Sequence, residues 1–127
     1  MTGKVVHFEI PYDDGERART FYGDTFGWQL VPVPDLGYTL VTTGPTDPET
    51  GATEPGFING GMFERTDEFP GKAPNIVIDV PDIDEFLRQV QAAGGDVVRG
   101  RTQVGDMGFT AYFTDTEGNL VGLWEDA

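Results

Sequence analysis

The same order of strand and helix patterns occurs twice in this chain of 127 residues. A strand pattern alternates apolar and polar residues, whereas a helix pattern repeats its apolar residues at every third or fourth position. In each half, one strand pattern precedes one helix pattern, and three strand patterns follow. Such a duplication restricts the chain to folds in which two equivalent units each pack a helix against a sheet. We therefore predict an α+β fold of two βαβββ modules in a single domain, residues 1–127.

The patterns also predict where the modules and their elements lie. Module one is predicted at 4–64 and module two at 73–126, with a charged linker at 65–72. Asp13 and Asp82 are the predicted N-caps of the two helices, because each has a glutamate three positions later. The predicted strands are 5–10, 28–33, 38–43 and 57–64 in module one, with a loop at 44–56, and 74–80, 96–99, 109–114 and 120–125 in module two.

Individual residues of the two halves correspond as well. His7 aligns with Asn75 and Gly27 with Gly95 at one constant offset. The ends of the modules match too, since Gly-Met-Phe-Glu at 61–64 resembles Gly-Leu-Trp-Glu at 122–125. Coincidence explains any single pair but not the shared order, so the pattern favours a true internal duplication.

Composition excludes several classes of function. The formal net charge of −14 argues against nucleic-acid binding, which needs a basic surface, and favours cationic ligands. The chain has no cysteine and one histidine, so thiolate chemistry and sites with several imidazoles are excluded. No apolar run reaches the roughly 20 residues of a membrane helix and no signal-peptide pattern is present, so we expect a cytoplasmic protein. An ordinary acidic protein and an adaptation to high salt both explain the charge.

Two segments carry a family resemblance. His-Phe-Glu-Ile at 7–10, Arg-Ala-Arg-Thr-Phe-Tyr at 17–22 and Phe-Gly-Trp at 26–28 resemble the opening of proteins of the glyoxalase/bleomycin-resistance/dioxygenase superfamily, also called vicinal-oxygen-chelate proteins. Phe-Thr-Asp-Thr-Glu-Gly-Asn-Leu-Val-Gly-Leu at 113–123 resembles their closing segment. The resemblance covers nearly the whole chain. It implies paired curved mixed sheets around a cleft, with the helices outside, and a homodimer.

Strand alternation then predicts which residues face that cleft. Phe8 and Ile10 should face a helix, which turns His7 and Glu9 toward the cleft. Trp28 is a further candidate for stacking on a ligand, whereas Phe21, Phe26 and Phe86 are expected in the core. The predicted cleft residues are His7, Glu9, Asn59, Gly61, Phe63, Asn75, Val77, Tyr112, Gly122 and Trp124.

The resemblance places the metal-binding positions of the family at His7, Gly61, Asn75 and Gly122, with Asn59 as an alternative in the fourth strand. Zinc, iron, nickel and manganese need three or four imidazole, carboxylate or thiolate donors. These positions offer one imidazole, one amide and two glycines, so we predict no metal and no cofactor. A weak site of His7 and Glu9 stays open as an alternative.

These observations leave three hypotheses for function. The first is a metal-free protein that binds or sequesters a small molecule of cationic or aromatic character, as the bleomycin-resistance members do. The second is a divergent lyase or isomerase of glyoxalase type, with His7 as its candidate catalytic residue. The third is an accessory protein with a vestigial cleft. Because two glycines would widen the cleft floor, we expect Gly122→Leu to abolish ligand binding at little cost in stability.

Overall fold

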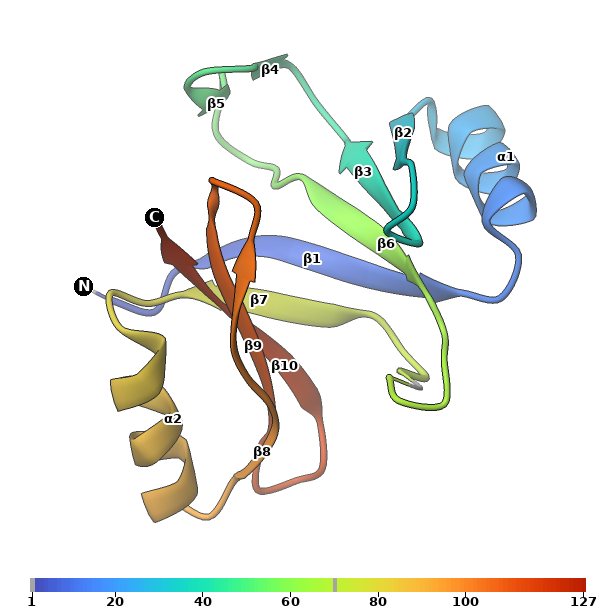
Figure 1. Cartoon of the computed structure of the whole chain (residues 1–127). Helices are drawn as coiled ribbons and strands as arrows, with labels where there is room; N and C mark the ends of the chain where they lie inside the picture. Colours follow the sequence, from blue (N-terminus) through green and yellow to red (C-terminus); the bar gives the residue numbers. More distant parts are fainter. Residues whose placement is uncertain (1, 70) are drawn as a thin grey trace. The chain divides into compact units, whose positions relative to one another are not determined.

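The computed structural model describes residues 2–69 and 71–127 and divides into two compact units (Figure 1). The first unit is His7–Pro74, and the second is Asn75–Ala127 together with the N-terminal segment that ends at Val6. That segment joins the second unit because the Gly3 N–H donates to the Asp79 carbonyl and the Lys4 carbonyl accepts from the Asp79 N–H. Each unit carries one helix and a mixed sheet, which confirms the predicted α+β fold of two βαβββ modules.

The sheet of the first unit has the strand order β2-β3-β6-β1. Strand β1 pairs in parallel with β6, β6 pairs antiparallel with β3, and β3 pairs antiparallel with β2. The elements are β1 (Val5–Tyr12), α1 (Gly15–Phe26), β2 (Gln29–Val33), β3 (Tyr38–Thr42), the short hairpin of β4 (Thr46–Asp47) and β5 (Gly51–Ala52), and β6 (Gly60–Glu64).

Helix α1 covers one face of this sheet (Figure 1). Its N-cap is Asp14, whose carboxylate accepts from the Arg17 N–H, so the prediction of Asp13 was wrong by one residue. Asp13 instead pairs with Arg65. Gly27 ends the helix as expected, in a left-handed conformation with φ 73° that costs glycine little.

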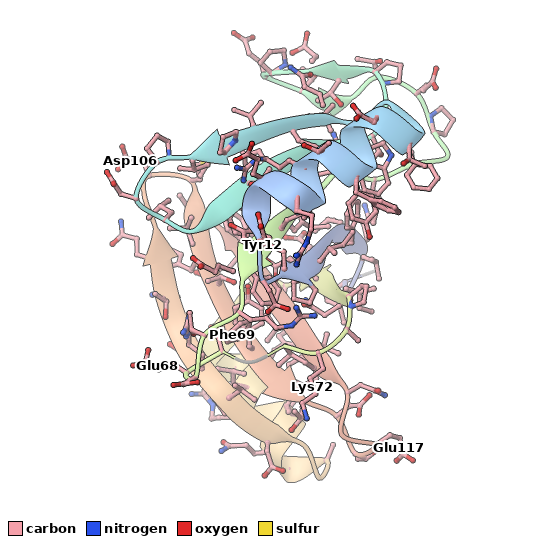
Figure 2. All side chains as sticks on the ribbon, turned by 90° about the vertical axis from the view of Figure 1, so that its right-hand side faces the viewer. Tyr12, Glu68, Phe69, Lys72, Asp106 and Glu117 are labelled. Atoms are coloured by element: carbon pink, nitrogen blue, oxygen red, sulfur yellow. The ribbon has the colours of Figure 1, made fainter. Side chains whose placement is uncertain are left out.

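The core of the first unit lies between α1 and the sheet. Tyr12, Val41 and Met62 are buried there, and Tyr12 stands at the base of α1 (Figure 2). The partly buried side chains packed around them are Phe8, Ile10, Ala18, Tyr22, Trp28 and Leu30. Alternate residues of β1 therefore meet the helix, as the strand pattern predicted.

The sheet of the second unit has the order β7-β10-β9-β8. Strand β10 pairs in parallel with β7 and antiparallel with β9, and β8 pairs antiparallel with β9. The elements are β7 (Asn75–Asp79), α2 (Ile83–Ala92), β8 (Asp96–Val104), β9 (Gly108–Thr114) and β10 (Leu120–Asp126). Asp82 caps α2 through the Glu85 N–H, as predicted. The core between α2 and the sheet is formed by Val80, Ile83, Leu87, Ala111, Phe113, Val121 and Leu123.

Three predicted strand boundaries were wrong by two residues or more. Strand β1 continues through Pro11 to Tyr12, because proline lacks only the N–H donor and its backbone can stay extended. Strand β6 begins at Gly60 rather than at residue 57, because the Ile58 carbonyl and the Asn59 side chain bond to Thr43 instead.

Strand β8 runs to Val104 rather than to residue 99. Its far half is polar and exposed, and register shifts interrupt the pairing with β9 on both sides of Arg99. Such an irregular edge strand has no clear alternation for the sequence to reveal. Within the described residues, neither helix is long and apolar enough to cross a membrane.

Candidate ligand-binding site

The candidate site begins on the sheet face of the first unit that α1 leaves uncovered. Phe8 and Ile10 pack toward α1, so His7 and Glu9 point to the opposite face. In β6, Met62 is buried under α1, which turns Gly61 to the face of Glu9, its partner in the parallel ladder.

On this face three polar side chains form one chain of hydrogen bonds. The Tyr38 hydroxyl donates to Glu9 Oε2 at 3.0 Å, and His7 Nε2 lies 2.9 Å from the same hydroxyl oxygen. Glu9 is buried with 4% of its surface exposed, whereas His7 and Tyr38 are partly exposed. Strands β1 and β3 thus bring together two predicted site residues, His7 and Glu9, and one that the sequence interpretation missed, Tyr38.

Tyr38 occupies the place of the side chain that Gly61 lacks. A Cβ atom added to Gly61 would overlap the Tyr38 hydroxyl and ring, and the three atoms nearest to it all belong to Tyr38. The expectation that Gly61 widens a cleft floor was therefore wrong. Glycine inside a strand marks a close approach of other groups, and this general signal pointed to the position. It did not identify the side chain that fills the space.

Burial sets the protonation of His7. Removal of the imidazole from water lowers the pKa of His7 below its ordinary value of 6.5, and the negative charge of Glu9 opposes this shift only in part. His7 is therefore neutral at physiological pH, and its ring can donate one hydrogen bond and accept another.

Phe63 extends the same face toward the link between β6 and β7. Its ring meets Phe69 edge-on with centroids 5.1 Å apart, and both side chains are buried. Figure 2 labels Phe69 and its neighbour Glu68 on this link. Phe69 thus limits the ring surface that Phe63 offers to a ligand.

In the second unit, Gly122 corresponds to Gly61, and its partner in the parallel ladder is Val77, which corresponds to Glu9. A Cβ atom on Gly122 would lie 3.1 Å from Val77 Cγ2 and 3.2 Å from Tyr112 Cε1. Val77, Tyr112 and Asn75 are buried. Because Val77 and Tyr112 already occupy this space, we expect leucine at 122 to cost stability, in contrast to the expectation from the sequence.

The remaining candidates have local roles. The Asn59 side chain accepts from the Thr43 N–H and donates to Thr46 Oγ1, so it anchors the loop beside β3. Trp124 donates from Nε1 to Asp126, and its ring lies against Gly108. These contacts account for the polar groups of both side chains inside their own units.

Several aromatic residues lie elsewhere than expected. Trp28 stacks on Tyr22 at 4.9 Å and packs against the core of the first unit, so its ring is engaged there rather than offered to a ligand as the sequence suggested. Phe21 and Phe26 were expected in the core, yet 56% and 60% of their surfaces are exposed on α1. No residue of α1 is fully buried, although Ala18 and Tyr22 pack against the core. The apolar pattern of the sequence therefore did not distinguish the side of the helix that packs from the side that is exposed.

The residues at the family's metal positions do not fit a transition metal. Gly61 and Gly122 supply no donor atom, Asn75 supplies only an amide, and His7 Nε2 already contacts Tyr38. No group of three or more His, Cys, Asp and Glu side chains gathers anywhere in residues 2–69 and 71–127. We therefore assign no chemical step to a metal.

Comparisons with known proteins agree with this architecture. Residues 4–44 match the family model described as bleomycin resistance protein-like N-terminal. A glyoxylase-like domain-containing protein of Didymella fabae is 34% identical over 122 residues, which cover 94% of this chain and 91% of the relative. The chain belongs to the glyoxalase/bleomycin-resistance superfamily.

Two further comparisons, one of sequence and one of structure, are informative for this superfamily member. A protein of Mycobacterium bovis that carries the word glyoxylase in its name is 29% identical over 128 residues, and this chain spans only 43% of its length. The crystal structure of methylmalonyl-CoA epimerase from Mycobacterium tuberculosis has a TM-score of 0.64 at 20% identity, with 97% of this chain and 87% of that chain covered. The second likeness concerns the fold alone.

Proposed function

We propose that this superfamily member is a small-molecule-binding or sequestering protein of the bleomycin-resistance kind that works without a metal. One observation carries the proposal: Tyr38 engages His7 and Glu9 and also fills the space beside Gly61. A metal at this position would have to displace the Tyr38 hydroxyl and compete with both of its hydrogen bonds. The site is thus suited to holding polar groups of an organic ligand.

The ligand that we propose is cationic or aromatic. A net charge of −14 concentrates cations near the protein, and aromatic rings bind flat or cationic groups. Within the site, His7 and Glu9 provide polar contacts. The other residues that we propose for ligand contact are Asn59, Gly61 and Phe63 in the first unit. In the second unit, taken by itself, the corresponding candidates are Asn75, Val77, Tyr112, Gly122 and Trp124.

Metal analysis combined with a binding screen tests this function. We expect protein purified without chelators to contain far less than one equivalent of transition metal. We also expect cationic aromatic compounds to raise its melting temperature both with and without chelator. Stoichiometric metal that is lost in His7→Gln would contradict the proposal. So would a visible absorption band from ferric iron bound to the Tyr38 phenolate.

A second candidate function is a lyase or isomerase that uses His7 as a base. The observation that favours it is a neutral imidazole linked to a buried carboxylate through Tyr38. Methylmalonyl-CoA, the ligand of one solved structural neighbour, is a suitable probe because its acidic C–H bond exchanges when a base attacks it. Deuterium uptake from heavy water that disappears in His7→Gln would support catalysis, and uptake no faster than in buffer would exclude it for this substrate.

We further propose a cytoplasmic C2 homodimer. Phe21 and Phe26 are large apolar side chains left exposed on one helix, which is typical of surfaces that another protein covers. Light scattering at micromolar concentration tests this assembly. A Phe21→Ser/Phe26→Ser variant should be monomeric if α1 forms the interface. Cell fractionation tests the location.

A further inference from the structure

We propose that Glu9 and Tyr38 hold the proton of neutral His7 on Nε2, so that Nδ1 is a fixed acceptor for an ammonium N–H group of the ligand. This inference rests on the proposed binding function and names the group of the ligand that the site recognises. His7 is then a specificity-determining residue, and Tyr38 and Glu9 position its proton.

The hydrogens available on the Tyr38 hydroxyl and on the His7 ring determine which ring nitrogen is protonated. The tyrosine hydroxyl has one hydrogen, and Tyr38 donates it to the carboxylate of Glu9. His7 Nε2 lies 2.9 Å from the Tyr38 oxygen, which has no second hydrogen to give. The hydrogen of that second bond must therefore come from Nε2. Because a neutral imidazole has only one N–H group, Nδ1 keeps its lone pair.

Nδ1 takes part in no hydrogen bond within residues 2–69 and 71–127. In the part of the chain that the structure describes, the His7 side chain makes its hydrogen bond through Nε2, and the ring is partly exposed. Burial disfavours a second proton on the ring, so the acceptor persists at neutral pH.

Charge selects the kind of donor. A protonated amine makes a stronger hydrogen bond to a neutral acceptor than an alcohol does, because the donor carries a charge. The net charge of −14 attracts the same ligands and repels anions. A carboxylate has no hydrogen to offer to Nδ1. We therefore expect ammonium compounds to bind better than neutral alcohols, and carboxylates to bind worst.

The proton position can be measured directly because His7 is the only histidine in the chain. Nitrogen-15 NMR of the free protein separates a protonated ring nitrogen from an unprotonated one. We expect Nε2 to be protonated and Nδ1 to be unprotonated at neutral pH. Tyr38→Phe should yield a mixture of tautomers, whereas Tyr22→Phe, which removes a hydroxyl from the helix side, should leave the wild-type signals. Protonated Nδ1 in the wild type, or an unchanged spectrum in Tyr38→Phe, would overturn the inference.

Titration with three matched probes tests the recognition step. Benzylammonium, benzyl alcohol and benzoate share one ring and differ in the polar group. We expect benzylammonium to shift the Nδ1 resonance and to bind most tightly, and Tyr38→Phe to weaken it about two- to tenfold, the range for one hydrogen bond. Equal binding of all three probes, or tightest binding of benzoate, would overturn the inference while leaving small-molecule binding intact. Failure of all three would count against both this inference and the proposed function, whatever the tautomer.

Discussion

Gly61→Ala tests the central contact of the candidate site. The added methyl group would overlap the hydroxyl and ring of Tyr38, which must then swing out of its position. Tyr38 would lose its hydrogen bonds to His7 and Glu9. The backbone of Gly61 does not require glycine, because its φ is not positive. The cost should therefore come from the displaced side chain alone.

The expected magnitude follows from these losses. Two hydrogen bonds contribute about 1 kcal/mol each, and the one to the carboxylate contributes at the upper end of the usual range. Crowding adds about 1 kcal/mol, while alanine in a strand returns about 0.5–1 kcal/mol relative to glycine. We expect a net loss of about 2 kcal/mol. Since urea slopes are about 1–3 kcal/mol per molar, the unfolding midpoint should fall by roughly 1 M.

Urea unfolding followed by tryptophan fluorescence measures this loss. Gly100→Ala is the matched control, because the space around Gly100 is open and its φ is not positive, so the change should be within about 0.5 kcal/mol. In a Tyr38→Ala background the Gly61→Ala change should become nearly neutral, which gives a coupling of about 2 kcal/mol. If Gly61→Ala costs the same with and without the tyrosine ring, Tyr38 does not fill this space.

Three further predictions concern stability. Gly122→Leu should cost about 2 kcal/mol or more in urea unfolding, because Val77 and Tyr112 already contact the position; a neutral result would show an open space there. Stability should fall as the pH drops below 6.5, since burial lowers the pKa of His7 and the unfolded chain takes up a proton that the folded chain resists. This part of the pH dependence should vanish in His7→Gln, and unfolding curves at about pH 5.5 and about pH 7.5 measure it. If self-repulsion from the charge of −14 destabilises the fold, the melting temperature should keep rising as the concentration of potassium chloride is raised into the molar range. A melting temperature that does not depend on salt would remove that explanation of the acidity.

Much of the fold could be predicted from the sequence, because alternation and helical periodicity act over short stretches of chain. The repeated order of patterns determined the two βαβββ modules. Phe8 and Ile10 identified the helix-facing side of β1 and so placed His7 and Glu9 on the other side. The helix ends at Asp82 and Gly27 followed from local hydrogen bonding and backbone conformation. Where alternation was weak, as in the polar half of β8, the prediction stopped too early.

The chemistry of the candidate site was decided only by the tertiary structure. Tyr38 on β3 reaches His7 and Glu9 on β1 across β6, because the strand order places β3 and β1 on either side of β6. Local periodicity in the sequence does not predict this strand order. Gly61 admits the tyrosine ring because it has no side chain, so an absence in one strand made room for a residue from another. From the sequence alone the two glycines predicted an empty floor. In the folded chain close packing fills both positions, since contacts from neighbouring strands occupy space that no single strand can account for.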